Sequence, residues 1–206
     1  MKKALVMIDM QRGFLDKDSS LCIKMAADTV PACARLIDHC HSEGIPVFFV
    51  TRRYRADGSD VEHTRYATWL EGGKPLSEEW PESADYPGEF NVLPGDYHII
   101  KPRFSAFFQT ELDMMLRRMR VDTVILAGTT TPNCIRTTMY DALSLEYNSI
   151  VISDCTSSVT EEIQRANLLD MANIGAHVMS LEEFMSGKEY ENTVELLHGA
   201  LTHCKE

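Results

Sequence analysis

The sequence has no hydrophobic run long enough to cross a membrane, and acidic side chains outnumber basic ones. No stretch approaches the roughly 18 consecutive apolar residues of a membrane-spanning helix. The apolar stretch at the N-terminus is too short for a secretory signal and is interrupted by Asp9. The 206 residues include 31 acidic and 20 basic side chains, a formal net charge of −11. These features predict a cytoplasmic protein and argue against nucleic acid and anionic membranes as partners.

Paired cysteine motifs and a nucleotide-binding glycine motif are also absent. The six cysteines form no C-x-x-C pair and no compact framework, so reduced thiols are expected. Cys33 and Cys40 lie on an apolar helical stripe and are predicted to be core residues. No G-x-G-x-x-G sequence follows the first predicted strand, which argues against a nucleotide-binding Rossmann protein. The cysteines are Cys22, Cys33, Cys40, Cys134, Cys155 and Cys204.

The sequence does contain a regular alternation of short apolar strands and helical patterns. Strands are predicted at residues 4–8, 46–51, 97–100, 124–127, 149–153 and 176–179. Helices are predicted at residues 28–43, 110–119, 132–147 and 158–174, with helical pieces after 181. A strand, a helix and a second strand make a right-handed βαβ unit, so the sheet is predicted to be parallel. The length fits one domain spanning residues 1–206.

Three residues with reactive side chains stand at or just beyond the ends of predicted strands. Asp9 ends the first strand, Lys101 ends the third, and Cys134 follows the fourth. The carboxyl ends of parallel strands share one edge of a sheet, so these three side chains are expected to converge. Each has an ordinary alternative: Asp9 as a turn cap, Lys101 as a surface residue, and Cys134 as a packed core residue.

The stretch around Cys134 has the features of a strand, a turn and a helix. An unbroken apolar run ends at Gly128, and three threonines lead into a helical pattern. Thr131 is predicted to be the N-cap and Pro132 the first helical residue, which puts Cys134 in the first turn. The unpaired N–H groups and the positive dipole end of that turn favour a thiolate.

Residues 52–97 are predicted to be a long loop insertion near the active site. A connection of this length inside a compact domain is usually functional, as a lid or a binding loop. Arg52, Arg53 and Arg55 form a candidate anion-binding group, because guanidinium groups match carboxylates. The alternative is that they are solvated charges or pair with nearby acids. Those acids are Asp57, Asp60 and Glu62.

A cysteine, an acid and a lysine in one cleft are the groups of a hydrolase that works without histidine. The thiolate of Cys134 would attack a carbonyl carbon. Asp9 would take the thiol proton and later give it to the leaving amine. Lys101 would stabilise the anionic species, and backbone N–H groups at the helix start would form an oxyanion hole. Water would then hydrolyse the thioester intermediate.

Three blocks of the sequence carry a family resemblance. Residues 5–11 read LVMIDMQ, residues 101–107 read KPRFSAF, and residues 128–142 read GTTTPNCIRTTMYDA. In this order and spacing they resemble the signature blocks of the isochorismatase-like cysteine hydrolase superfamily, over about residues 4–180. The resemblance implies an α/β fold of three layers (α-β-α). Its six-stranded, mainly parallel sheet would have helices on both faces.

The same resemblance implies roles for single residues. Asp9, Lys101 and Cys134 match the catalytic triad, and a non-proline cis peptide is expected between Thr129 and Thr130. The oxyanion donors would be the backbone N–H groups of Thr130 and Cys134. Members of the superfamily usually form dimers or larger assemblies, so a homo-oligomer, either a dimer or a tetramer, is expected.

The end of the second strand departs from one branch of the superfamily. Metal-dependent nicotinamidases carry an Asp-x-His arrangement there, whereas Arg52, Arg53 and Tyr54 follow Thr51 in this chain. No metal and no cofactor are therefore expected. Members acting on isochorismate can lack the cysteine, so Cys134 favours C–N bond cleavage. The alternatives are a nicotinamidase-like deamidase and a non-catalytic binding protein that keeps the fold.

The arginines suggest a small amide or ureido substrate that bears a carboxylate. Aromatic residues near the predicted site are candidate pocket walls, with core packing as the alternative. The candidate substrate-binding residues are Arg52, Arg53, Arg55, Phe14, Tyr54, Arg103, Phe104 and Asn133.

Overall fold

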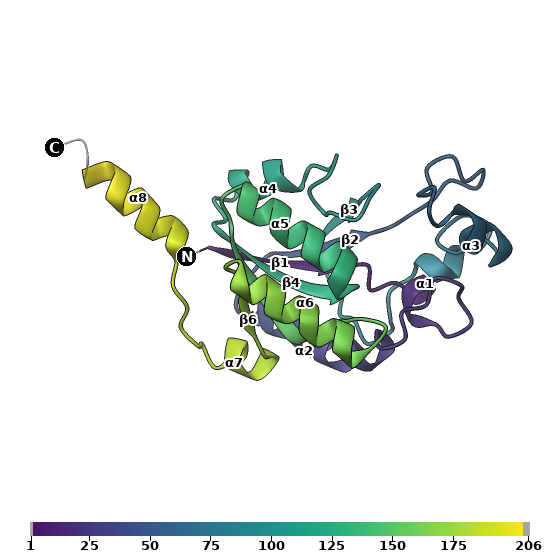
Figure 1. Cartoon of the computed structure of the whole chain (residues 1–206), viewed down its shortest axis with the longest axis horizontal. Helices are drawn as coiled ribbons and strands as arrows, with labels where there is room; N and C mark the ends of the chain where they lie inside the picture. The colour runs from purple at the N-terminus through teal and green to yellow at the C-terminus, as the bar shows by residue number, and fades with distance from the viewer. Residues whose placement is uncertain (1, 204–206) are drawn as a thin grey trace.

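A six-stranded sheet lies at the centre of the computed structural model, which describes residues 2–203 (Figure 1). The strands are β1 (Lys3–Ile8), β2 (Val47–Thr51), β3 (Tyr97–Ile100), β4 (Thr123–Thr129), β5 (Asn148–Ser157) and β6 (His177–Met179). Their order is β3-β2-β1-β4-β5-β6, and every neighbouring pair is parallel. The predicted parallel sheet is confirmed. Cys204 lies outside the described residues.

Helices pack on both faces of the sheet and make three layers. Residues of β1 alternate between the two faces, so Leu5 and Met7 join one buried cluster while Val6 and Ile8 join the other. The first cluster includes residues of α2 (Val30–Ser42) and α7 (Leu181–Met185). The second includes residues of α4 (Leu112–Arg118), α5 (Arg136–Ser144) and α6 (Glu161–Asn173). The predicted three-layer fold is confirmed.

Helix α2 forms where apolar residues recur at helical spacing. Its buried residues are Val30, Cys33, Leu36, Ile37 and Cys40. Cys33 and Cys40 are fully buried, which confirms their predicted place in the core. The helix covers the sheet face that holds Leu5 and Met7.

The fifth strand is longer than predicted and shifts the start of the following helix. β5 continues to Ser157, with a register shift against β4. Helix α6 begins after Thr160, whose hydroxyl accepts a hydrogen bond from the Ile163 N–H at 3.3 Å. The predicted helix start at residue 158 is therefore wrong, because Ser158 is buried directly after the strand and Thr160 is the N-cap. Helix α5 also ends early, at Ser144.

The segment between β2 and β3 is ordered by a helix, a 3₁₀ turn and a buried cluster that it shares with residues 14–21. It contains α3 (Tyr66–Glu71) and the 3₁₀ turn η2 (Pro81–Ala84), and it lies at one end of the molecule beside α1 (Arg12–Leu15) (Figure 1). Trp69 is fully buried, and its Nε1 donates to the Pro75 carbonyl at 2.8 Å. The cluster consists of Phe14, Leu21, Tyr54, Val61, Trp69 and Leu76. Tertiary packing therefore orders much of the predicted loop insertion.

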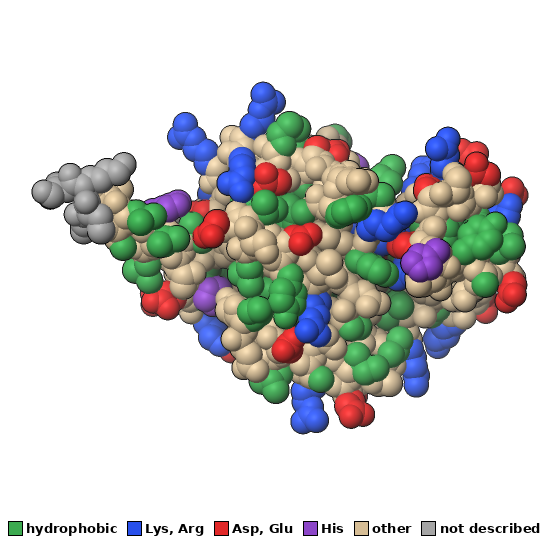
Figure 2. Space-filling view, turned by 45° about the horizontal axis from the view of Figure 1, so that its top comes forward, with side chains coloured by type: hydrophobic (Ala, Val, Ile, Leu, Met, Phe, Trp, Pro, Cys, Tyr) green, Lys and Arg blue, Asp and Glu red, His purple; other side chains and the backbone are tan. Residues whose placement is uncertain are grey.

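Helix α8 (Thr193–His203) projects from the opposite end of the molecule (Figure 1). Its residues Leu196, Leu197 and Leu201 are exposed. Hydrophobic side chains are visible beside the grey C-terminal atoms in Figure 2. The first residue of the helix contacts β5, because Thr193 Oγ1 donates to Asn148 Oδ1 at 3.2 Å, whereas these leucines stay exposed. None of the described helices combines the length and apolarity needed to cross a bilayer.

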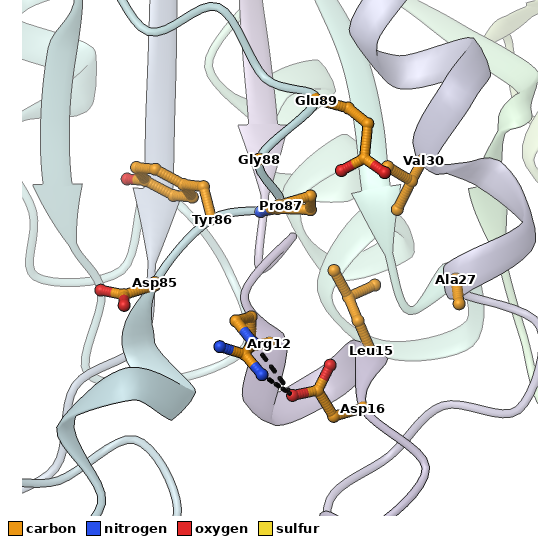
Figure 3. A pocket seen from close by; sticks show the side chains of 10 residues that line it. All are labelled: Arg12, Leu15, Asp16, Ala27, Val30, Asp85, Tyr86, Pro87, Gly88 and Glu89. Carbon is orange, nitrogen blue, oxygen red and sulfur yellow. Dashed lines mark hydrogen bonds and ion pairs between the residues drawn. The ribbon is translucent and has the colours of Figure 1, made fainter.

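A cavity of about 450 Å³ opens beside α1 and the 3₁₀ turn η1 (Ala27–Thr29) (Figure 3). Residues 85–89 form its other wall. Arg12 and Asp16 form an ion pair at its rim, with Nη2 and Oδ2 3.0 Å apart. The reactive side chains at the sheet edge do not line this cavity.

Candidate active site

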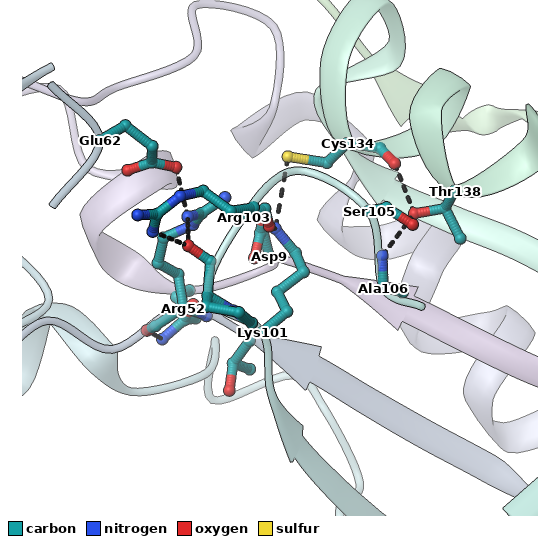
Figure 4. A network of polar contacts seen from close by, with 12 residues as sticks. Asp9, Arg52, Glu62, Lys101, Arg103, Ser105, Ala106, Cys134 and Thr138 are labelled. Carbon is teal, nitrogen blue, oxygen red and sulfur yellow. Dashed lines mark hydrogen bonds and ion pairs between the residues drawn. The ribbon is translucent and has the colours of Figure 1, made fainter. Parts of the chain in front are cut away.

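The side chains of Asp9, Lys101 and Cys134 meet at the carboxyl edge of the sheet (Figure 4). The Lys101 ammonium lies 2.7 Å from Asp9 Oδ2 and donates to Cys134 Sγ at 3.5 Å. All three residues are at most 2% exposed. The convergence expected from their positions after β1, β3 and β4 is therefore present, and Lys101 joins the other two side chains.

Asp9 reaches this position because the ends of β1 and β4 lie unusually close together. Gly128 pairs with Ile8, and a Cβ on Gly128 would lie 2.0 Å from the Ile8 carbonyl oxygen. Gly128 also has φ +113°, a conformation that L side chains rarely adopt. Asp9 itself has φ +52°, and its N–H donates to the Val50 carbonyl at 2.9 Å. Glycine is thus required for the close approach that positions the carboxylate.

The turn that carries Cys134 differs from the predicted helix start. The expected cis peptide between Thr129 and Thr130 is present, and a π-helical turn, η3 (Thr131–Ile135), begins at Thr131. The hydroxyls of Thr130 and Thr131 both donate to the Ser157 carbonyl at 3.0 Å. Thr131 is therefore not the N-cap: Thr130 occupies that position, and its side chain makes no capping bond. The two hydroxyls instead fix the turn to the end of β5.

Burial raises the pKa of the Cys134 thiol above its ordinary value. Lys101 and Arg52 act in the opposite direction, and the negative charge of Asp9 adds to the increase. The expectation that the helix start favours a thiolate omitted this desolvation. Burial therefore favours the neutral thiol over the thiolate. Asp9 Oδ1 is buried and has no hydrogen-bond partner among the described residues.

Thr138 links the cysteine turn to the segment that follows Lys101, a role that the sequence reasoning missed. Its Oγ1 donates to the Cys134 carbonyl at 2.6 Å and accepts from the Ala106 N–H at 2.9 Å. Thr138 lies one helical turn after Cys134 and is fully buried. This spacing puts both residues on one helix face, a signal that could have indicated the link.

Arg52 is the predicted arginine that lies deepest in the protein. It is fully buried and forms an ion pair with Glu62, as the alternative interpretation proposed. Gln11, another residue that the sequence reasoning missed, brackets its backbone: Oε1 accepts from the Arg52 N–H at 2.8 Å and Nε2 donates to its carbonyl at 2.9 Å. Burial lowers the pKa of Arg52, but nearby groups, Asp9 first and then Tyr54, raise it, and the net shift is upward.

The other predicted arginines lie on the surface. Arg53 and Arg55 are exposed. Arg103 is also exposed, and its Nη1 donates to the Asp60 carbonyl at 3.0 Å, which ties the segment after β3 to the segment after β2. The side chains of the four arginines therefore do not form one group. The Arg52 side chain is buried beside the centre, whereas Arg103 reaches it through its backbone carbonyl, which accepts from Lys101 Nζ at 3.1 Å.

The remaining candidate residues divide between the buried cluster and the edge of the site. Phe14 and Tyr54 belong to the cluster around Trp69, which explains their burial without a ligand. Phe104 is half-buried and lies against Arg52, whose Cζ is 5.8 Å from the ring centroid. Asn133 is exposed in the cysteine turn, and its N–H donates to the Thr130 carbonyl at 3.1 Å.

Within residues 2–203, no three His, Cys, Asp or Glu side chains are grouped as a metal site requires. Arg52 and Arg53, directly after β2, offer guanidinium groups rather than metal ligands.

Known proteins resemble this chain over most of its length. The isochorismatase domain matches residues 3–183, so the chain belongs to the isochorismatase family. A probable inactive nicotinamidase of Arabidopsis thaliana is 38% identical, covering 88% of this chain and 93% of the relative. A maleamate amidohydrolase of Pseudomonas putida is 30% identical, covering 89% of this chain and 85% of the relative. An isochorismatase family protein from Desulfovibrio vulgaris is 39% identical in sequence, and its crystal structure superposes with a TM-score of 0.84. The match covers 89% of this chain and 96% of that protein.

Proposed function

We propose that this protein is a cysteine-dependent amidohydrolase that cleaves the C–N bond of a small amide or ureido compound. The observation that carries the proposal is the buried contact of Lys101 with both Asp9 and Cys134. The family membership supports it, since relatives are named maleamate amidohydrolase, ureidoacrylate amidohydrolase and N-carbamoylsarcosine amidase.

In the first half of the proposed reaction, Asp9 accepts the Sγ proton of Cys134 and the thiolate attacks the carbonyl carbon of the substrate. The negative charge moves to the carbonyl oxygen of a tetrahedral intermediate. Protonated Asp9 then gives its proton to the leaving nitrogen, the C–N bond breaks, and a thioester on Cys134 remains. Lys101 stabilises the carboxylate and the thiolate in turn, because its ammonium reaches both.

The proposed oxyanion hole consists of the backbone N–H groups of Thr130 and Cys134. The hydroxyls of Thr130 and Thr131 are engaged by Ser157, which supports a fixed backbone at this turn. Each such donor typically contributes about 3–4 kcal/mol to the transition state. In the second half of the reaction, Asp9 takes a proton from water, and the hydroxide attacks the thioester. The S–C bond of the second tetrahedral intermediate breaks, Asp9 returns its proton to the departing thiolate of Cys134, and the acid product leaves.

The substrate is proposed to carry a carboxylate or a similar acceptor that binds Arg52. The Nε and Nη2 atoms of Arg52 are buried and have no hydrogen-bond partner among the described residues. A guanidinium edge with free N–H groups matches a carboxylate. Arg53, Arg55 and Arg103 are exposed, so they are assigned the weaker role of attracting anions toward the site.

Access to the centre requires movement of the side chains above it. Cys134 is 2% exposed, too little for a substrate to reach Sγ directly. The contact of Arg103 with the Asp60 carbonyl and the packing of Arg65 on Phe104, 5.1 Å from Cζ to ring centroid, join the two segments that flank the site. We propose that these two segments separate when substrate binds.

The test is ammonia release from small amides, carbamoyl acids, ureido acids and nicotinamide, by the wild type and Cys134→Ala, with and without a chelator. Chelator-resistant release that disappears in Cys134→Ala supports the thiol mechanism. Chelator-sensitive release from nicotinamide would instead support a metal-assisted deamidase. Release that survives in Cys134→Ala would refute the Cys134 assignment. No release from any compound would favour a non-catalytic protein, an alternative raised by the inactive plant relative.

We also propose that the protein is a cytoplasmic homo-oligomer, a dimer or a tetramer. The exposed leucines of α8 support association, because an isolated helix of this length is marginal in water. Light scattering on the full chain and on a variant lacking residues 193–206 checks this, with a smaller assembly expected for the variant. Free thiols at the five described cysteines suit a reducing compartment.

A further inference from the structure

Glu62 and Arg52 form a buried charge pair at the edge of the candidate active site (Figure 4). Arg52 is fully buried and Glu62 is 5% exposed. Arg52 Nη1 contacts Glu62 Oε1 and donates to the Pro102 carbonyl at 3.1 Å. Glu62 Oε2 accepts from the Tyr54 hydroxyl at 2.7 Å. Burying the Glu62 carboxylate costs desolvation energy, which only a well-placed cation and hydrogen bonds can offset.

These contacts hold one end of the guanidinium group and leave the other end unpaired. The ring centroids of Tyr54 and Phe104 lie 5.7 and 5.8 Å from Arg52 Cζ and restrict its rotation. Nη1 is occupied, whereas Nε and Nη2 are buried without a hydrogen-bond partner among the described residues. Three N–H groups of a buried cation thus lack an acceptor, which is costly unless a ligand supplies one.

We propose that Glu62 is a positioning residue: it holds Arg52 so that the Nε–Nη2 edge takes the carboxylate of the substrate, and its negative charge limits the preference of the site for anions. The proposal rests on the proposed function, in which Arg52 binds that carboxylate. Glu62 itself does not touch the substrate. It acts through geometry, by fixing Nη1, and through charge, by neutralising part of the field of Arg52 at Cys134.

The two effects predict opposite results for two substitutions of Glu62. Glu62→Gln keeps an oxygen for Arg52 Nη1 and a polar partner for Tyr54, but it removes the negative charge, so the preference for anions rises. Glu62→Ala removes the same charge and also the contact that orients Arg52. A guanidinium group that is no longer held in place does not take the carboxylate, so the preference falls. A purely structural role for Glu62 would move both variants in the same direction.

The probes are iodoacetate, which carries a carboxylate, and iodoacetamide, its neutral analogue. Both alkylate Cys134 by forming an S–C bond with loss of iodide, and mass spectrometry of the peptide containing Cys134 gives each rate. The ratio of the iodoacetate rate to the iodoacetamide rate is compared with that of glutathione in the same buffer. We expect a ratio above glutathione for the wild type and a further rise, on the order of tenfold, for Glu62→Gln. Glu62→Ala is expected to return to the glutathione ratio.

The matched control is Glu79→Gln, the same substitution at an exposed acid of the same segment, whose Oε1 lies 3.6 Å from Lys74 Nζ. It is expected to leave the ratio unchanged. The proposal is overturned if the wild-type ratio equals that of glutathione, or if the ratio in Glu62→Gln is unchanged or lower. Both outcomes can be measured even if Glu62→Ala does not fold. Hydrolysis that survives in Cys134→Ala while the alkylation ratios follow the expected pattern counts against the proposed mechanism alone. With a hydrolysed anionic substrate, Glu62→Gln should lower KM and leave kcat nearly unchanged.

Discussion

Replacing Gly128 by alanine tests whether the close contact of β1 and β4 holds Asp9 in place. A Cβ at this position would lie 2.0 Å from the Ile8 carbonyl oxygen and 2.8 Å from the Ile8 nitrogen. Both are backbone atoms, so the clash cannot be relieved by a side-chain rotation. The end of β1, which carries Asp9, would have to move away from β4 by more than an ångström to reach ordinary contact.

The chain supplies a matched control at Gly175. Its φ is +112°, almost equal to that of Gly128, but nothing lies within 4 Å of its hypothetical Cβ. Gly175→Ala therefore measures the backbone strain alone, about 1–2 kcal/mol. Gly128→Ala adds the clash, which costs about 2–3 kcal/mol more because a packed interior resists extra atoms.

Urea unfolding of both variants measures the difference in the free energy of unfolding, and alkylation of Cys134 by iodoacetamide reports on the centre. We expect Gly128→Ala to lose more stability than Gly175→Ala and to change the alkylation rate, while Gly175→Ala keeps the wild-type rate. Equal losses of stability in the two variants would refute the reasoning, because the contact with Ile8 would then carry no energetic weight.

Three further predictions concern the same centre. Burial raises the pKa of the Cys134 thiol above that of the unfolded chain, which is about 8.5. The stability of the wild type relative to Cys134→Ala should therefore be constant below this pH and fall as the pH rises above it. Urea unfolding at several pH values measures the difference. Arg103→Ala removes an exposed hydrogen bond to Asp60, worth about 1 kcal/mol, and should speed alkylation of Cys134 a few-fold; an unchanged rate contradicts the proposed opening. Thr138→Val leaves the buried Ala106 N–H without its acceptor and should cost about 1–3 kcal/mol in urea unfolding, whereas an unchanged midpoint would show that water replaces the hydroxyl.

The convergence at the sheet edge could be predicted because it depends on topology alone. Once β1, β3 and β4 are parallel, the residues that follow them share one edge, whatever the loops do. Lys101 follows β3, which is separated from β1 by β2, and its long side chain spans the gap to Asp9. The argument needs only the apolar strands and the polar residues that follow them, and both are visible in the sequence.

The surroundings of the centre could not be predicted in the same way, because they depend on which side chains become buried. Arg52, Arg53 and Arg55 are chemically alike and adjacent in sequence, yet only Arg52 is buried, beside a carboxylate ten residues away. The direction of the Cys134 pKa shift has the same origin. The position of Cys134 near a helix start could be predicted, although the N-cap is one residue earlier than expected, whereas the desolvation could not.

The charges of the centre constrain how it can select a substrate. Asp9 and Glu62 provide two negative groups, Lys101 and Arg52 provide two positive ones, and Arg65 adds a third positive group, with Nη1 3.9 Å from Glu62 Oε1. Moving a proton from Cys134 to Asp9 replaces the negative charge of the carboxylate by that of the thiolate, so the proposed reaction can begin in a buried site without changing the total charge of the centre. A neutral amide would leave the total charge of the centre unchanged, whereas a carboxylate would add one negative charge. The free N–H groups of Arg52 give the selection of an anionic substrate a direction that the summed charge alone does not supply. Glu62 is consequently the residue whose substitution separates geometry from charge.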